Sequence, residues 1–144
     1  MLLTELLHPG ILAPLAGAGH GARVLLADGH YPASTAVGDR AATVHLNLAP
    51  GLLDVTTVLD VLLRALPVES AHVMTPPEGP EPPPISEYRD RLADIQVETL
   101  GRFEFYEAAR SSDLALAVVT ADTRTYANLL LTIGVRAEGT LIAP

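Results

Sequence analysis

The run Arg23-Val24-Leu25-Leu26-Ala27-Asp28 decides the fold class, because it is apolar without alternation and ends in a carboxylate. Such a run is typical of a strand that is buried on both faces. A second run, from Leu114 to Thr120, is rich in Ala, Val and Leu. Between the two, apolar residues recur at helical spacing after Asp54, a good helix N-cap, until Pro67 ends the helix. Strands that alternate with helices predict an α/β sandwich with a mostly parallel or mixed sheet.

The remaining elements are short and are predicted from local patterns and from the placement of Gly and Pro. Residues 75–84 contain six of the twelve prolines, so this segment is predicted to be an extended surface loop and neither helix nor central strand. The chain is expected to form one domain over residues 1–144. Further helices are expected over 9–16, 86–92, 103–110 and 124–132, and further strands over 42–48, 68–74, 97–100 and 135–142.

Composition excludes several classes of function. Nine basic residues, all of them Arg, stand against 17 acidic ones, and the formal net charge of −8 disfavours nucleic acid and anionic membranes as partners. The absence of Lys removes Schiff-base catalysis, and the absence of Cys removes disulfides and thiolate chemistry and fits the cytoplasm. No apolar run is long enough for a transmembrane helix. Glu5 and two prolines interrupt the apolar N-terminus and argue against a signal peptide.

The glycine-rich segment Gly17-Ala18-Gly19-His20-Gly21-Ala22 fits the pattern G-x-G-x-x-A. A dinucleotide site needs a strand before this pattern and a helix after it, whereas here the predicted order is the reverse. The glycines therefore read as a helix-to-strand turn. Their small neighbours leave His20 exposed, and imidazole suits proton transfer near neutral pH. His20 is thus either a candidate acid/base residue or an ordinary residue of the turn.

Asp28 lies at the carboxyl end of a predicted strand, where open α/β sheets collect ligands. Its carboxylate can accept hydrogen bonds from ligand hydroxyls, or it can cap its own turn. His20, Asp28 and His30 match no standard pattern of metal ligands. No metal is therefore expected.

Three more polar residues follow predicted strand ends. Arg102 is either a rigid donor fork for a ligand oxygen or a surface arginine. Tyr126 offers a hydroxyl and a ring face, and Asn128 offers both a donor and an acceptor, although both also fit a polar helix surface. The chain shows neither a nucleophile elbow nor a carboxylate pair typical of glycosidases.

Taken together, these segments resemble the RbsD/FucU family of ribose pyranases and fucose mutarotases, from the N-terminal helix to about Val135. The Tyr31-Pro32 turn and the Arg102-Phe103 block resemble the fucose branch more closely. The chain departs from the pattern at Ala127, where members usually carry Gly. The segments that carry the resemblance are Gly19-His20-Gly21, Ala27 to Ala33, Arg102 to Ala108, and Tyr126 to Leu131 with Gly134-Val135.

The resemblance implies a three-layer α/β/α sandwich and a cofactor-free isomerase that interconverts the anomers of a free monosaccharide, L-fucose first. It makes His20 the proton donor. It also implies ring-like homo-oligomers, often decamers, with sites near subunit contacts. The sugar-binding positions that it implies are Asp28, Arg102, Tyr126 and Asn128.

Two alternatives stay open on the sequence. One is a D-ribose pyranase, which exchanges pyranose and furanose forms by the same ring-opening chemistry. The other is a monosaccharide-binding module without catalysis, which would not need His20. The sequence does not assign roles to His30, Tyr106 or the proline-rich loop 75–84, and it does not reveal whether one chain holds a complete site.

Overall fold

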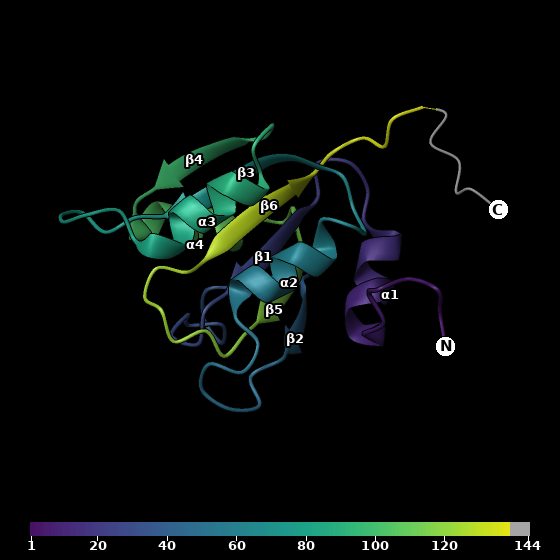
Figure 1. Cartoon of the computed structure of the whole chain (residues 1–144), viewed down its shortest axis with the longest axis horizontal. Helices are drawn as coiled ribbons and strands as arrows, with labels where there is room; N and C mark the ends of the chain where they lie inside the picture. Colours follow the sequence, from purple (N-terminus) through teal and green to yellow (C-terminus); the bar gives the residue numbers. More distant parts are fainter. Residues whose placement is uncertain (139–144) are drawn as a thin grey trace.

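A computed structural model describes residues 1–138, which form one six-stranded sheet with helices packed on both faces (Figure 1). In chain order the elements are α1 (Pro9–Gly17), β1 (Arg23–Ala27), β2 (Ala42–His45), α2 (Val55–Leu62), β3 (Val68–Met74), α3 (Pro83–Arg91), β4 (Gln96–Leu100), α4 (Arg102–Ala109), β5 (Leu114–Val119) and β6 (Leu129–Ile133). Among these residues, no helix is both long and apolar enough to cross a membrane.

The sheet is mixed, as predicted. Its strand order is β2-β5-β1-β6-β3-β4, and β6 runs antiparallel to both of its neighbours while the other pairs are parallel. The two runs that decided the fold class, β1 and β5, are adjacent and parallel. Their carboxyl ends therefore open at the same edge of the sheet, which places Asp28 beside the segment that follows Val119.

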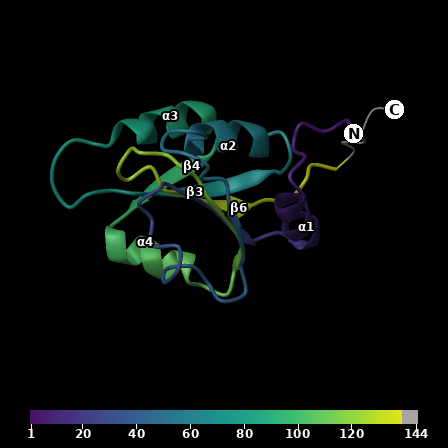
Figure 2. The ribbon, with the colours of Figure 1, turned by 90° about the horizontal axis from the view of Figure 1, so that it is seen from below.

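The three-layer sandwich is confirmed, with a separate apolar core on each face of the sheet. Figure 2 shows the sheet edge-on, with α2 and α3 on one side and α4 on the other. Side chains of β1 alternate between the cores: Val24 and Leu26 pack in one, and Leu25 and Ala27 in the other. Since both faces are covered, β1 can be apolar at every buried position.

Two predicted elements near the C-terminus are wrong. Residues 124–132 were expected to be a helix, but they form a loop followed by strand β6. All five residues of β6 are buried because this strand lies between β1 and β3, and such burial overrides the helical tendency of its leucines. The strand expected over 135–142 is not present over 135–138, and the rest of it lies outside the described residues.

The other differences concern element ends. Helix α3 begins at Pro83, inside the segment predicted to be loop, and Ser86 is not its N-cap. Proline is tolerated in a first helical turn, because the N–H it lacks has no partner there. Strand β2 ends at His45 and helix α2 at Leu62, each earlier than predicted.

Candidate functional site

A cavity of about 130 Å³ lies at the carboxyl end of β1, and it gathers four of the five predicted site residues. Asp28 follows β1, Arg102 begins α4, and the other two precede β6. His30, Tyr106 and Met74 complete much of the wall. The two residues that precede β6 are Tyr126 and Asn128.

Asp28 joins two loops at the base of this cavity. It is almost fully buried, and its carboxylate accepts hydrogen bonds from the backbone N–H groups of His30 (2.9 Å) and Ala127 (3.1 Å). Its own N–H donates to Oδ1 of Asn128 at 2.8 Å. Burial raises the pKa of the Asp28 carboxyl, and the two backbone donors partly offset this effect. Each carboxylate oxygen can still accept a further hydrogen bond from a ligand hydroxyl.

Tyr126 has a strained backbone at the mouth of the cavity. Its φ of 59° lies in the left-handed region, which costs a residue with a side chain about 1–2 kcal/mol. The next residue is held at both of its backbone polar groups, since the Ala127 N–H donates to Asp28 and the Ala127 carbonyl accepts from the buried Tyr88 hydroxyl at 2.9 Å. The position where family members usually carry Gly is fully buried here and accommodates Ala.

Arg102 and Tyr126 form the polar rim. The guanidinium donates to the Tyr126 hydroxyl oxygen at 3.0 Å and lies 5.8 Å from the centre of its ring. Because this oxygen accepts from Arg102, its own O–H is directed elsewhere and can donate to a ligand. The remaining guanidinium N–H groups of Arg102 can also donate hydrogen bonds to a ligand.

Another part of the wall is aromatic and apolar. The rings of Tyr31 and Tyr106 pack edge to face with their centres 5.5 Å apart, and Met74 lines the same cavity. The Tyr31 hydroxyl donates to the Ala36 carbonyl at 2.7 Å. His30 also lines the cavity, with its Nε2 3.2 Å from the Thr123 carbonyl oxygen. The cavity thus combines an apolar wall with a few polar groups, as small-molecule sites do.

His20 does not belong to this cavity. It lies in the turn between α1 and β1, at the opposite end of β1 from Asp28, and a strand of this length spans roughly 15 Å. Its side chain is 60% exposed, and Nε2 lies 2.8 Å from a carboxylate oxygen of Glu69. A separate hollow of about 350 Å³ adjoins it, lined by Leu15, Leu66 and Gly134 among others.

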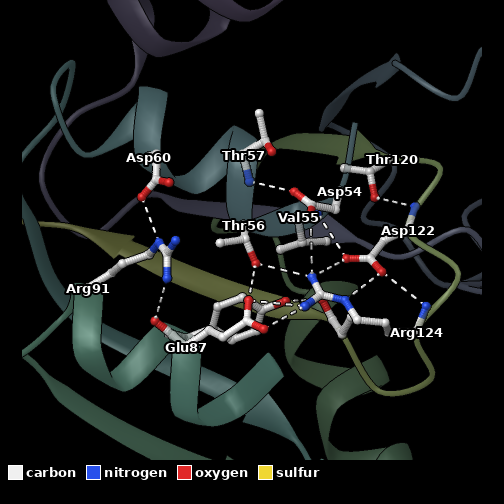
Figure 3. Close-up of polar contacts among 12 residues, drawn as sticks. Asp54, Val55, Thr56, Thr57, Asp60, Glu87, Arg91, Thr120, Asp122 and Arg124 are labelled. Carbon is white, nitrogen blue, oxygen red and sulfur yellow. Dashed lines mark hydrogen bonds and ion pairs between the residues drawn. The ribbon is translucent and has the colours of Figure 1, made fainter. Parts of the chain in front are cut away.

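A charged cluster that the sequence analysis missed involves the loop that leads to Tyr126 (Figure 3). Asp122 is nearly fully buried, and Arg124 binds it together with Glu87 of α3. Asp122 follows β5 as Asp28 follows β1, so the strand-end rule that identified Asp28 could have identified it. Within residues 1–138, no group of three or more His, Asp or Glu side chains is placed to hold a metal ion.

This cluster predicts a component of acid sensitivity. Burial by itself raises the pKa of Asp122, but hydrogen bonds from Arg124 and from the Val55 N–H outweigh it and lower the pKa below 3.8. The Thr56 hydroxyl and Arg124 likewise lower the pKa of Glu87 below 4.5. A lowered carboxyl pKa contributes stability above the unfolded-state pKa that is lost as pH falls through the folded-state value. The raised pKa of Asp28 has the opposite effect, because it favours the folded state as the pH falls.

We therefore expect the free energy of unfolding to decrease as pH falls below about 4.5. The decrease should be shallower in Arg124→Met, because that variant lacks the charge that lowers both pKa values. Urea denaturation at a series of pH values measures the free energy of unfolding of each protein. Equal slopes for the wild type and the variant would contradict the prediction.

The comparisons with known proteins fit this geometry. Residues 1–136 match the model of the RbsD / FucU transport protein family. The chain is 33% identical to a fucose mutarotase of Homo sapiens, over 95% of this chain and 94% of the relative, and 31% identical to one of Mus musculus, over 92% of each.

Two solved structures have the same fold. Bacillus subtilis RbsD complexed with D-ribose superposes with a TM-score of 0.82 at 24% identity, over 95% of this chain and all of that one. A fucose mutarotase from Streptococcus pneumoniae in complex with L-fucose superposes with a TM-score of 0.77 at 25% identity, over 90% of this chain and 94% of that one. The chain is therefore a member of the RbsD/FucU family.

Proposed function

We propose that this chain is a monosaccharide mutarotase that interconverts the anomers of free L-fucose. The observation that carries the proposal is its similarity, at 31–33% identity and over nearly the full length, to relatives named fucose mutarotase. The small cavity at the end of β1 supports it, because both polar and apolar side chains line it. The activity is an isomerisation, and the cytoplasm predicted from the cysteine-free sequence is its proposed location.

Ring opening sets the chemical requirement. A proton is delivered to the ring oxygen and another leaves the anomeric hydroxyl, so the bond between C1 and the ring oxygen breaks and an aldehyde forms. Rotation about C1–C2 and reclosure on the other face give the second anomer. All heavy atoms stay in the sugar, and an imidazole that gives one proton to the ring oxygen and takes one from the anomeric hydroxyl returns to its protonated form. No cofactor enters this sequence of steps.

The pocket residues would hold the sugar during this cycle. Asp28 would accept hydrogen bonds from sugar hydroxyls, while Arg102 and Asn128 would donate to sugar oxygens. The Tyr126 O–H, which its hydrogen bond from Arg102 leaves free to donate, is suited to a sugar oxygen near the rim. These roles use the groups that line the cavity.

His20 would act on a sugar held by another copy of the chain. Within one chain, β1 separates it from the cavity, yet its ring is exposed at the surface and held by Glu69. Exposed apolar side chains occur beside both half-sites: Val135 follows Gly134, which lines the hollow beside His20, and Phe103 lies with Arg102. Apolar side chains exposed at two different places fit a head-to-tail contact that closes into a ring. We propose a homo-oligomer whose sites form between neighbouring copies, the decamer of the family resemblance being one such ring.

The apolar wall favours a 6-deoxy sugar. L-fucose carries a methyl group at C5, and Met74 with the rings of Tyr31 and Tyr106 offers it a surface. D-ribose has no such group. This wall is the structural reason to place fucose before ribose.

NMR saturation transfer between anomeric protons tests the proposal. With catalytic amounts of the protein, we expect faster exchange between α- and β-L-fucopyranose than in buffer alone. Exchange between pyranose and furanose forms of D-ribose, without any effect on fucose, would instead identify a ribose pyranase. Binding of either sugar without faster exchange would identify a non-catalytic binding module.

A further inference from the structure

The loop between β5 and β6, residues 120–128, carries Tyr126 and Asn128 and contains neither helix nor strand. Pocket residues on such a segment need support from the rest of the fold, because a strained residue keeps its conformation only where its surroundings fix it. Tyr88 and Asp28 fix the end of the loop near Ala127. The start of the loop is held by the cluster in Figure 3.

Arg124 is the centre of this cluster, and all three of its side-chain nitrogens form hydrogen bonds within the protein. Two bond the Asp122 carboxylate in a fork, at 2.9 Å from Nε and 2.7 Å from Nη2. Nη1 donates to both oxygens of Glu87 at 3.0 Å, and the other Nη2 hydrogen reaches the Thr56 hydroxyl at 3.1 Å. One guanidinium therefore ties the loop to α2 and α3 at once, which a planar fork can do and a single ammonium cannot.

Asp122 transmits this support to the base of the cavity. Its carboxylate also accepts the Val55 N–H at the start of α2, at 3.1 Å. Its backbone carbonyl accepts the N–H of Gly29 at 2.9 Å, and a Cβ on Gly29 would lie only 3.1 Å from that oxygen. Asp28 is the neighbour of Gly29. Since Asp122 is 2% exposed, removal of Arg124 would leave a buried carboxylate without its counter-charge.

We propose that Arg124 is a positioning residue for the sugar site: through Asp122 and Glu87 it holds the 120–128 loop so that Tyr126 and Asn128 meet the sugar in a fixed geometry. Arg124 does not line the cavity, and each of its side-chain nitrogens is bonded within the protein, so it acts on the sugar through the loop and not by contact. This inference rests on the proposed function for its activity measurements, but the order of the loop can be measured without any sugar.

Arg91 supplies a matched control. It lies on α3, is exposed to a similar degree (33% against 31% for Arg124), and also forms a bond with a carboxylate, Asp60 of α2, at 2.7 Å. It bonds the backbone carbonyl of Glu87 as well, at 3.2 Å. Arg91 therefore joins α3 to α2, but its hydrogen bonds to Asp60 and Glu87 do not reach the 120–128 loop. Arg91→Met should leave fucose exchange at the wild-type level.

In Arg124→Met we expect anomeric exchange of L-fucose to fall by about 10- to 100-fold, the usual result of slightly misplaced substrate-binding groups. In Arg124→Lys, which keeps the charge and is the safer variant for folding, we expect a smaller loss. The Arg124→Met effect should shrink in a Tyr126→Phe background, because the hydroxyl it would misplace is already absent. Such non-additivity would not follow from a general loss of stability.

Amide hydrogen exchange gives the readout that needs no sugar. The N–H groups of Asp28 and Ala127 are bonded to pocket side chains, and they should exchange faster in Arg124→Met than in Arg91→Met. If these amides and the fucose rates are the same in both variants, the positioning role is wrong. If the wild type itself does not accelerate fucose exchange but the amides respond as expected, the proposed function is wrong and the role of Arg124 in ordering the loop stands.

Discussion

His20→Ala should lose nearly all acceleration of L-fucose anomer exchange. A positioned acid/base group contributes about 10²–10⁴-fold to a proton transfer, and no other imidazole has been assigned to the ring oxygen here. The fold should be unaffected, because the side chain is 60% exposed and its one described polar contact is the pair with Glu69. Saturation-transfer NMR measures the exchange rate, and urea denaturation establishes that the variant is folded.

Two other histidine variants make this result specific. His45 is exposed on the edge strand β2, outside the described cavities, so His45→Ala should exchange fucose like the wild type. His30 lines the sugar cavity of its own chain and is the competing acid/base candidate. If His30→Ala is inactive while His20→Ala keeps full activity, the reaction uses His30 and one chain holds the complete site.

The central part of the fold could be predicted from the sequence because two strands are apolar throughout. β1 and β5 are buried on both faces, so their composition identifies them without reference to their neighbours. Asp28 could be predicted as a site residue by the same reasoning, since a polar residue that ends such a strand lies at the ligand-binding edge. Here local sequence and final structure agree.

Strand β6 could not be predicted in the same way. Leu129-Leu130-Leu131 is equally compatible with a helix, and only its position between β1 and β3 makes it a strand. The left-handed backbone of Tyr126 is another property of the folded chain, because the contacts that hold it come from residues 28 and 88, far away in sequence. The same holds for Arg124, whose partner Glu87 is 37 positions away.

The separation of His20 from the other site residues is also invisible in the sequence. His20 and Asp28 are eight positions apart, and that spacing is compatible with neighbours as well as with opposite ends of a strand. The extended strand β1 lies between them and places them at its opposite ends. If His20 is the acid/base residue, as we propose, a single chain holds two half-sites that must meet in an assembly.

Mixed assemblies of two inactive variants test this requirement. His20→Ala keeps an intact sugar pocket, and Arg102→Ala keeps an intact His20; Arg102 is exposed, so its loss should not disturb folding. If each site takes its histidine from one copy and its pocket from a neighbour, random co-assembly restores about one quarter of the sites. Co-expression with two different tags, followed by purification over both, gives the mixed assemblies for the fucose exchange measurement.

The matched control mixes two variants of the same half-site. Arg102→Ala and Tyr126→Phe both alter the pocket of one chain, where their side chains are bonded to each other at 3.0 Å. Their mixture can form no intact pocket, so its activity should stay at the mean of the two parents. If the mixture of His20→Ala with Arg102→Ala also stays at the mean of its parents, the site is not shared between copies. Recovery in that mixture alone would require His20 to act on a sugar bound by another chain, because neither variant contains both groups.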